Sequence, residues 1–321
     1  MSPRALVTGA AGFVGQHVAR HLLAGGWEVT GASAAPPADG TSTLDARERD
    51  AVRWVTGDLR VPDALRALVD EVRPDAIVHL AGIAHVMSAQ QDPALAYEVN
   101  VGIGARLIAL VRQRHGAGLL DPVVLVVGSA EQYGRHDVSE GPLREDALQV
   151  PVTVYAATKA AQEIIALEGH RGGGVHVVCT RSFNHAGRGQ APTFLLPSLA
   201  QRVKALRRSG GDTLALGNTT PVRDYLHVDD VARAYVALLA RGASGEVYNV
   251  SSGTGHDVAS MARRMLALAG VSAVLGSDPA LVRAVDVPVL VGDSSRLRSA
   301  TGWSPAKSLD DLLADVLDAS P

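Results

Sequence analysis

The alternation of apolar and polar positions divides the chain into two parts. In the first part, runs rich in Val, Ile and Leu alternate with longer segments of helical periodicity. The runs predict strands at residues 5–9, 28–33, 52–58, 76–82, 123–129 and 175–183, and the longer segments predict helices at 13–25, 62–72, 93–115 and 154–170. Nearly continuous apolar strands separated by helices indicate a parallel sheet covered on both faces. The pattern predicts an α/β fold with a doubly wound parallel sheet.

The pattern changes after residue 184. Loops rich in Gly, Pro and Asn separate predicted helices at 193–208, 229–241, 256–270 and 308–318 and a strand at 246–250. We interpret this part as a smaller C-terminal α/β domain whose segments interleave with the end of the sheet. The predicted division is a larger domain of residues 1–183 plus about 225–250, and a smaller domain of about 184–224 and 251–321.

Composition narrows the class of protein. The 321 residues are 47% hydrophobic and 20% charged, which is typical of a globular protein, and the net charge of -3 argues against nucleic acid or an anionic membrane as the main partner. No apolar run reaches the roughly 20 residues of a membrane span, and "MSPRALVTGA" has no leader pattern, so we expect a cytoplasmic protein. The lone Cys179 excludes an internal disulfide, and no Cys/His cluster predicts a metal.

A glycine-rich turn follows the first predicted strand. In "TGAAGFVG", Gly9, Gly12 and Gly15 stand at three-residue intervals where the strand meets a helix. Small residues let the backbone approach a pyrophosphate, and the free N–H groups of the helix N-terminus favour its negative charge. The turn therefore predicts a dinucleotide site.

Two further strand ends fit a dinucleotide. Asp58 in "TGDLR" could accept a hydrogen bond from an adenine amino group, or it could cap the helix that begins near Pro62. The small residues of "HLAG" (79–82) could lie under the cofactor. The second strand ends in "GASAAPP", with Ser33 and no acidic residue to bind a ribose 2′-hydroxyl. This absence favours NADP(H), while NAD(H) stays open because no arginine stands in the usual place.

A tyrosine and a lysine stand four residues apart in "VYAATKAAQE". Lysine occurs only at positions 159, 204 and 307, so the pair Tyr155/Lys159 is more than a common coincidence. A hydride added to a carbonyl needs a proton donor, and an ammonium one helical turn away would lower the phenol pKa from about 10. Ser129, at the end of the fifth predicted strand, could orient the carbonyl oxygen. We expect Ser129, Tyr155 and Lys159 to be catalytic.

Motifs along almost the whole chain resemble one family. They are "TGAAGFVG", "GDLR", "HLAG", "GSAEQYG", "YAATK", "RSFNHAGRGQAP", "PVRDYLHVDD" and "GEVYNVSSG". Together they resemble the extended short-chain dehydrogenase/reductase family, in its nucleotide-sugar (NAD-dependent epimerase/dehydratase) group. The segments "RSFNHAGRGQ" and "DVPVLVGDSSRLRSATGW" are most similar to GDP-4-keto-6-deoxy-D-mannose reductases. The resemblance implies a Rossmann sheet, an NAD(P) cofactor, a nucleotide-sugar substrate, and a homodimer built from the helices around 93–115 and 154–170.

The resemblance also implies site residues. For the cofactor they are Gly9, Gly12, Phe13, Val14, Gly15, Ser33, Asp58, Leu59, Leu80, Ala81, Gly82, Tyr155 and Lys159. For the substrate they are His85, Ser129, Asn184, His185, Arg188, Arg223 and Arg283. Guanidinium groups bind a pyrophosphate in bidentate fashion, which suits Arg223 and Arg283. Around Arg283 the family's Arg-Pro-x-Asp reads Arg-Ala-Val-Asp, so the loop there departs from the family pattern.

Glu131 leaves the type of reaction open. A dTDP-glucose type of 4,6-dehydratase has an Asp-Glu pair after the catalytic hydroxyl, but here Ala130 precedes Glu131. The GDP-mannose type uses the Glu alone, so a GDP-mannose 4,6-dehydratase stays an alternative, as do a 4-epimerase and a dinucleotide sensor without activity. We expect an NAD(P)H-dependent reduction of the C4 keto group of a nucleotide-linked 4-keto-6-deoxyhexose, preferably GDP-4-keto-6-deoxy-D-mannose, to GDP-D-rhamnose or its C4 epimer.

Overall fold

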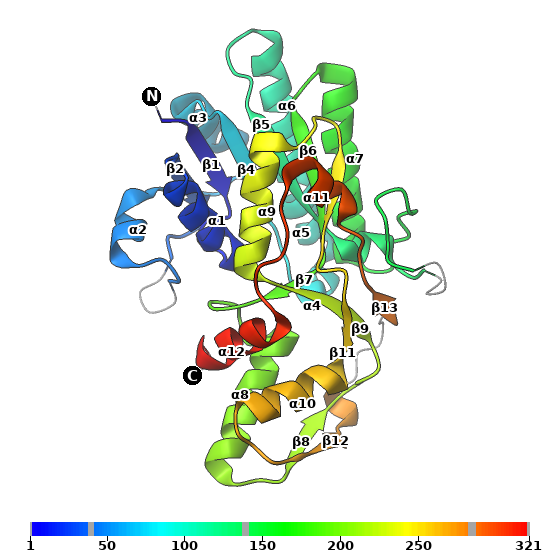
Figure 1. The fold of residues 1–321 in the computed structure, drawn as a ribbon. Coiled ribbons are helices and arrows are strands. Elements are labelled where there is room, and N and C mark those ends of the chain that lie inside the picture. The colour runs from blue at the N-terminus through cyan, green and yellow to red at the C-terminus, as the bar shows by residue number, and fades with distance from the viewer. Residues whose placement is uncertain (1, 38–41, 137–140, 282–286, 320–321) are drawn as a thin grey trace.

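The larger of two lobes is built around a parallel sheet (Figure 1). The computed structural model describes residues 2–37, 42–136, 141–281 and 287–319. Within them, seven strands follow the order β10-β6-β5-β4-β1-β2-β3, and every neighbouring pair is parallel. The strands are β1 Arg4–Thr8, β2 Glu28–Ser33, β3 Arg53–Thr56, β4 Ala76–His79, β5 Val123–Ser129, β6 Val177–Ser182 and β10 Val247–Val250. The predicted doubly wound parallel sheet is confirmed.

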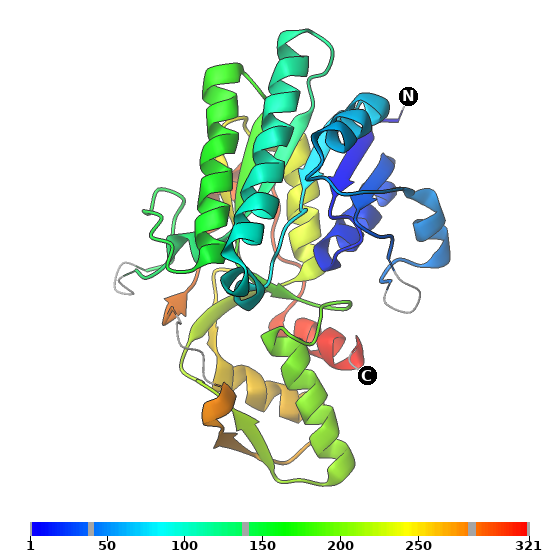
Figure 2. The same cartoon turned by 180° about the vertical axis from the view of Figure 1, so that it is seen from behind.

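Helices cover both faces of this sheet. On one face lie α1 Phe13–Ala24, α9 Val228–Arg241 and α11 Ser295–Thr301, and on the other lie α3 Pro62–Val72, α6 Ile103–Gly116 and α7 Val154–Gly173. Figure 2 shows α6 and α7 side by side on the outside of the lobe. Each face has its own apolar core, the first including Val7 and Leu238 and the second Ile77 and Leu107. The strands read as continuous apolar runs because both faces are buried.

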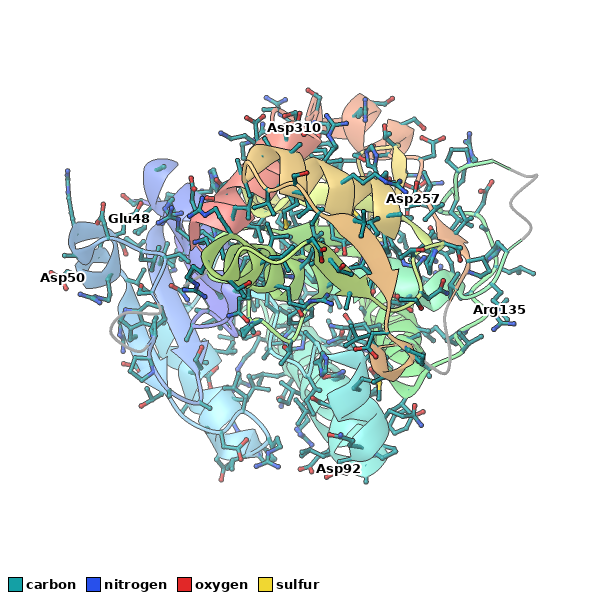
Figure 3. The ribbon with its side chains drawn as sticks, turned by 90° about the horizontal axis from the view of Figure 1, so that it is seen from below. Glu48, Asp50, Asp92, Arg135, Asp257 and Asp310 are labelled. Carbon is teal, nitrogen blue, oxygen red and sulfur yellow. The ribbon has the colours of Figure 1, made fainter. Side chains whose placement is uncertain are left out.

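A second lobe holds the smaller core. It contains α8 Leu195–Ser209, α10 Val258–Leu268, α12 Leu309–Ala319 and the two-stranded sheet of β8 Thr213–Leu216 and β12 Val274–Ser277. Between the lobes, β9 Val222–His227 pairs with β7 Asn184–Ala186, β11 Gly255–Asp257 and β13 Val289–Leu290. Seen from this lobe, Asp92 and Asp310 lie at opposite edges of the molecule (Figure 3). The predicted domain boundaries stay a prediction, although α9 and β10 pack on the large sheet.

Several elements differ from the expectation. The predicted helix at 93–115 consists of α5 Pro93–Ala96, a π-helical turn Tyr97–Gly102 and α6. Its 24 residues, Pro93–Gly116, are long and apolar enough to cross a membrane by length and composition alone, which the sequence had not suggested. The short helices α2 Ala46–Ala51 and α4 Val86–Gln91, and the 3₁₀ turns Ala130–Tyr133 and Pro279–Leu281, were not predicted.

Candidate active site

The candidate site lies at the carboxyl ends of β1, β4, β5 and β6. The order of the strands reverses between β1 and β4, and ligands of doubly wound sheets bind in the crevice outside such a switch point. Thr8, His79, Ser129 and Ser182 end these four strands, so the loops that follow them surround the crevice.

The glycine-rich turn is packed tightly on its inner side. Gly9 has φ +73, and a Cβ there would lie 2.8 Å from Ala81 N on the chain leaving β4. A Cβ on Gly15 would lie 2.4 Å from Gly9 O, so this glycine lets α1 approach the sheet. Gly12 is exposed and is the N-cap of α1. The N–H groups of Phe13 and Val14 belong to the first turn of that helix, so an anion in front of Gly12 would meet them.

The side chain at the end of β2 fastens the turn. Ser33 Oγ accepts a 2.9 Å hydrogen bond from Ala11 N and donates to Ala32 O. Ala32 O also accepts from Gly9 N at 2.7 Å. The predicted cofactor residue Ser33 therefore shapes the backbone of the glycine turn through its hydroxyl.

Asp58 is exposed, and Arg60 holds it. Its carboxylate accepts hydrogen bonds from Arg60 N at 2.9 Å and from the guanidinium at 2.7–3.0 Å. These bonds hold the pKa of Asp58 below its usual value. Helix α3 begins with Val61 at its N-cap, so the alternative of Asp58 as a helix cap is wrong. Leu59 beside it is buried.

The turn after β4 is bound to neighbouring elements. Leu80 N donates to Thr8 O at 3.1 Å, and Ala81 N lies 3.3 Å from Thr8 Oγ1. A Cβ at Gly82 would lie 2.9 Å from Asn100 Oδ1. These contacts hold the predicted cofactor segment 80–82 against β1 and the helix that follows.

A hydrogen bond joins Ser129 to Tyr155 beside the end of β5. Ser129 is the last residue of β5, and its Oγ accepts from Glu131 N at 3.2 Å. Burial raises the pKa of Tyr155 to about 12, a hydrogen bond with Ser129 lowers it, and the negative charge of Glu131 raises it. The phenol therefore carries its proton at neutral pH, and the Glu131 carboxylate interacts with it electrostatically.

Lys159 is buried in the same part of α7. Its Nζ donates to Val127 O at 2.8 Å and to Gln162 Oε1 at 3.2 Å, and burial lowers its pKa to about 8. The sequence predicted that this ammonium lowers the pKa of Tyr155, but the phenol pKa is raised instead. The physical reason is that burial disfavours the phenolate more than the hydrogen bond from Ser129 favours it. The Lys159 ammonium instead donates its hydrogen bonds to Val127 on β5 and Gln162 on α7.

The segment after β6 reaches the glycine turn. Asn184 begins β7, and the ring of His185 stacks on Phe13 with centroids 6.1 Å apart. His185 Nδ1 lies 2.9 Å from Phe183 O, so this nitrogen carries the proton, and burial lowers the pKa of the ring. Arg188 N donates to Asp315 Oδ2 at 2.7 Å, while its guanidinium lies near the same carboxylate.

Other predicted substrate residues lie on the second lobe side. His85 contacts Ser88 Oγ at 3.0 Å and meets the edge of the Phe194 ring at 5.6 Å between centroids. Arg223 lies on β9, largely buried, and donates to Val222 O at 2.9 Å. Arg283 lies outside the described residues.

Sequence reasoning missed a cluster beneath the 187–190 segment. His17 on α1 lies 2.7 Å from Asp229 Oδ1 through Nδ1 and 3.0 Å from Arg188 O through Nε2. The hydrogen bond from His17, together with the His21 ring 3.8 Å from the same carboxylate, holds the pKa of Asp229 far below its usual value. The only signal in the sequence was a histidine on the buried face of an apolar helix.

It also missed a buried polar network beside Ser129. Gln132, Glu163 and Arg181 are each at most 5% exposed, and both Gln132 and Arg181 donate hydrogen bonds to the Glu163 carboxylate. Two features of the sequence could have indicated it: Arg181 is a charged residue within the apolar run 175–183, and Glu163 follows Lys159 by four residues.

A doubly wound parallel sheet with a glycine-rich turn after its first strand is typical of NAD(P)-dependent Rossmann-fold enzymes. The hydrogen-bonded pair of Ser129 and Tyr155 lies beside the end of β5. The family model described as "NAD dependent epimerase/dehydratase family" matches residues 5–251, and the chain belongs to this family.

Relatives of known activity extend the comparison over the whole chain. The chain is 31% identical over 318 residues to the GDP-6-deoxy-D-mannose reductase of Pseudomonas aeruginosa, covering 99% of this chain and 97% of that one. It is 32% identical to a dTDP-glucose 4,6-dehydratase of Streptomyces griseus, covering 98% and 93%. The solved structure of RMD from Pseudomonas aeruginosa complexed with NADPH superimposes with a TM-score of 0.81 at 29% identity, covering 99% and 98%. The expected resemblance is confirmed.

Proposed function

We propose that this enzyme reduces the C4 keto group of a nucleotide-linked 4-keto-6-deoxyhexose, preferably GDP-4-keto-6-deoxy-D-mannose. The observation that carries the proposal is the placement of the Tyr155 phenol, which is hydrogen-bonded to Ser129 at the end of β5 and lies one helical turn from Lys159 on α7. A protonated phenol is the form that a carbonyl reduction needs. The full-length similarity to a GDP-6-deoxy-D-mannose reductase supports the substrate class.

The residues would divide the reaction as follows. When bound, the reduced nicotinamide supplies the hydride that C4 of the sugar receives. The Ser129 hydroxyl orients the carbonyl oxygen, and Tyr155 Oη gives its proton to that oxygen as the C4–H bond forms. Lys159 supplies positive charge below the phenol and a donor for the nicotinamide ribose. The product is an alcohol, and the phenolate regains its proton from solvent.

The cofactor proposal favours NADP(H). Ser33 ends β2 without an acidic side chain, so nothing at that position repels a 2′-phosphate. The Gly9–Gly15 turn would hold the pyrophosphate, and Asp58 and Leu59 would border the adenine. NAD(H) stays the alternative.

The substrate would lie between the lobes. Arg223 offers a guanidinium for the pyrophosphate from the largely buried strand β9. Asn184 and His185 come from β7, which pairs with β9, so the two segments face the substrate from one small sheet. Arg188 and His85 would border it, and Arg283 is proposed on the motif alone.

One observation favours a second candidate function. The negative charge of Glu131 raises the pKa of the Tyr155 phenol. Glu131 stands where the acid–base group of a GDP-mannose 4,6-dehydratase would stand. A dehydratase relative at 32% identity fits this alternative.

The test is an assay of the purified protein with NADPH and GDP-4-keto-6-deoxymannose generated in situ, followed at the nicotinamide absorbance and by product NMR. Oxidation of NADPH with formation of a GDP-6-deoxyhexose supports the reductase and reads the C4 configuration. Conversion of GDP-mannose to its 4-keto derivative without added reductant, lost in Glu131→Gln, supports the dehydratase instead.

The proposal includes a homodimer. Helices α6 and α7 lie side by side on the outside of the lobe (Figure 2), and Ile164 on α7 is 64% exposed. A second copy packed on α6 and α7 would cover Ile164. Light scattering should give twice the chain mass, and Ile164→Glu should give monomers. The cytoplasmic location stays a prediction.

A further inference from the structure

A buried glutamine links the turn of Ser129 to the helix of Tyr155. Gln132 Oε1 accepts a 2.7 Å hydrogen bond from Ser129 N, and Gln132 Nε2 donates to Glu163 Oε2 at 2.9 Å and to Gln149 Oε1 at 3.1 Å. The backbone N–H of Ser129 can only donate and the carboxylate can only accept, so the amide has one possible orientation. Its side chain is fully buried.

Glu163 provides a rigid base for this contact. It is 3% exposed and, among the described side chains, accepts hydrogen bonds from Gln132, from Gln149 at 2.6 Å and from Arg181 at 2.7 and 3.0 Å. Arg181 lies on β6, and its guanidinium carbon is 4.8 Å from the centre of the Tyr133 ring. The ion pair therefore joins α7 to the sheet, and four hydrogen bonds hold the Glu163 carboxylate in place.

Position along α7 gives the network its significance. Tyr155, Lys159 and Glu163 follow one another at intervals of four residues, so they share one face of the helix. The Glu163–Gln132 bond therefore fixes the 3₁₀ turn of Ser129 and Glu131 relative to Tyr155. A glycine is needed at position 128, because a Cβ there would lie 2.3 Å from Gln132 Oε1 and displace the glutamine side chain.

We propose that Gln132, held by Glu163, is a positioning residue that sets the Ser129 hydroxyl against the Tyr155 phenol for proton transfer. This inference rests on the proposed function, in which Ser129 and Tyr155 handle the carbonyl oxygen. A displacement of about 1 Å in such a pair can lower turnover about 100-fold.

Gln149 offers a matched control. Like Gln132, Gln149 donates a hydrogen bond to the Glu163 carboxylate, and it also accepts one from Gln132. Among the described residues, however, no hydrogen bond joins Gln149 to Ser129. Gln132→Leu and Gln149→Leu therefore each remove a bond to the same carboxylate, and only the first releases the Ser129 turn. Gln132→Met serves as a second variant if Gln132→Leu does not fold.

The experiment measures kcat and KM with NADPH and GDP-4-keto-6-deoxymannose, NADPH affinity by fluorescence and thermal unfolding. We expect Gln132→Leu to lower kcat about 10-fold to 100-fold, with KM and NADPH affinity within about twofold, and Gln149→Leu to leave kcat within about threefold. Adding Gln132→Leu to Ser129→Ala should cost nothing further, because Gln132 acts through Ser129.

Equal losses in the two glutamine variants, or full additivity with Ser129→Ala, would overturn the inference. Ser129→Ala and Tyr155→Phe separate it from the proposed function. If both of these variants keep their turnover, the proposed function fails; if they lose it while Gln132→Leu keeps it, only the role of Gln132 fails.

Discussion

Lys159 Nζ donates a 2.8 Å hydrogen bond to the backbone carbonyl of Val127, two residues before the end of β5. The bond joins the helix of the candidate proton donor to the strand of Ser129. A carbonyl is neutral, so it only partly replaces the water lost by the ammonium, and burial lowers the pKa of Lys159 to about 8.

This pKa predicts how stability depends on pH. The folded pKa of about 8 lies below the ordinary 10.5, so between these values the unfolded chain binds the proton and the folded one does not. The free energy of unfolding should therefore rise with pH in this window. Relative to Lys159→Met, we expect a gain of about 1.5 kcal/mol between pH 8 and 9.5. Denaturant titrations of both proteins measure it, and parallel curves for the two would contradict it.

Tyr155→Phe should abolish turnover while leaving the cofactor site intact. Loss of the phenolic hydroxyl, which carries the acidic proton of this side chain, should lower kcat about 1000-fold. Fluorescence titration should give an NADPH affinity within about twofold of the parent. Tyr97→Phe, at an exposed tyrosine of the π-helical turn, is the control and should leave kcat unchanged. A Tyr155→Phe enzyme with near-parental turnover is incompatible with the assigned proton donor.

The glycines of the turn should differ in what they do. Gly9→Ala places a Cβ against the chain after β4 in a left-handed conformation, so it should destabilise the fold by at least about 1–2 kcal/mol. Gly12→Ala meets only Gly9 O at 3.1 Å on an exposed surface, so the melting temperature should hardly change. Its Cβ should weaken NADPH binding, because the backbone can no longer approach the pyrophosphate. Calorimetry measures the melting temperature of each variant, and fluorescence titration measures its NADPH affinity.

Arg223→Ala should act on substrate binding. Loss of a charge-assisted hydrogen bond of about 1.5–3 kcal/mol should raise the KM for the nucleotide sugar about 10-fold to 100-fold. NADPH affinity should stay the same, because Arg223 lies on β9 rather than on the large sheet. Arg207→Ala, on the exposed side of α8, is the control. If the two variants have equal KM values for the nucleotide sugar, the assignment of Arg223 to the substrate site is wrong.

The large sheet could be predicted because most of its strands are apolar runs that end in a polar residue, such as Thr8 of β1 and Ser129 of β5. Strands such as β7 and β13 could not, because they have two or three residues and form only where β9 offers a neighbour. The 3₁₀ turn after Ser129 is equally hidden, since it depends on Gln132 folding back over Gly128.

The candidate residues were predictable by motif, while their electrostatics were not. Tyr155 and Lys159 share a helix face by spacing alone, but the pKa of each follows from burial in the fold. The partner of Asp58 is two residues away, and a sequence with many arginines does not show which one turns toward it. Gln132 and Glu163 meet across 31 residues, beyond any local pattern.

The edge position of β10 has a consequence for synthesis. β10 pairs with β6 at one end of the large sheet, yet residues 183–246 separate the two strands and include α8, β8 and β9. On the ribosome, β6 therefore emerges with an open edge that only a much later segment can close. The enzyme cannot be divided into its lobes by one cut in the chain, and a fragment that stops after β6 carries an unpaired strand prone to aggregation.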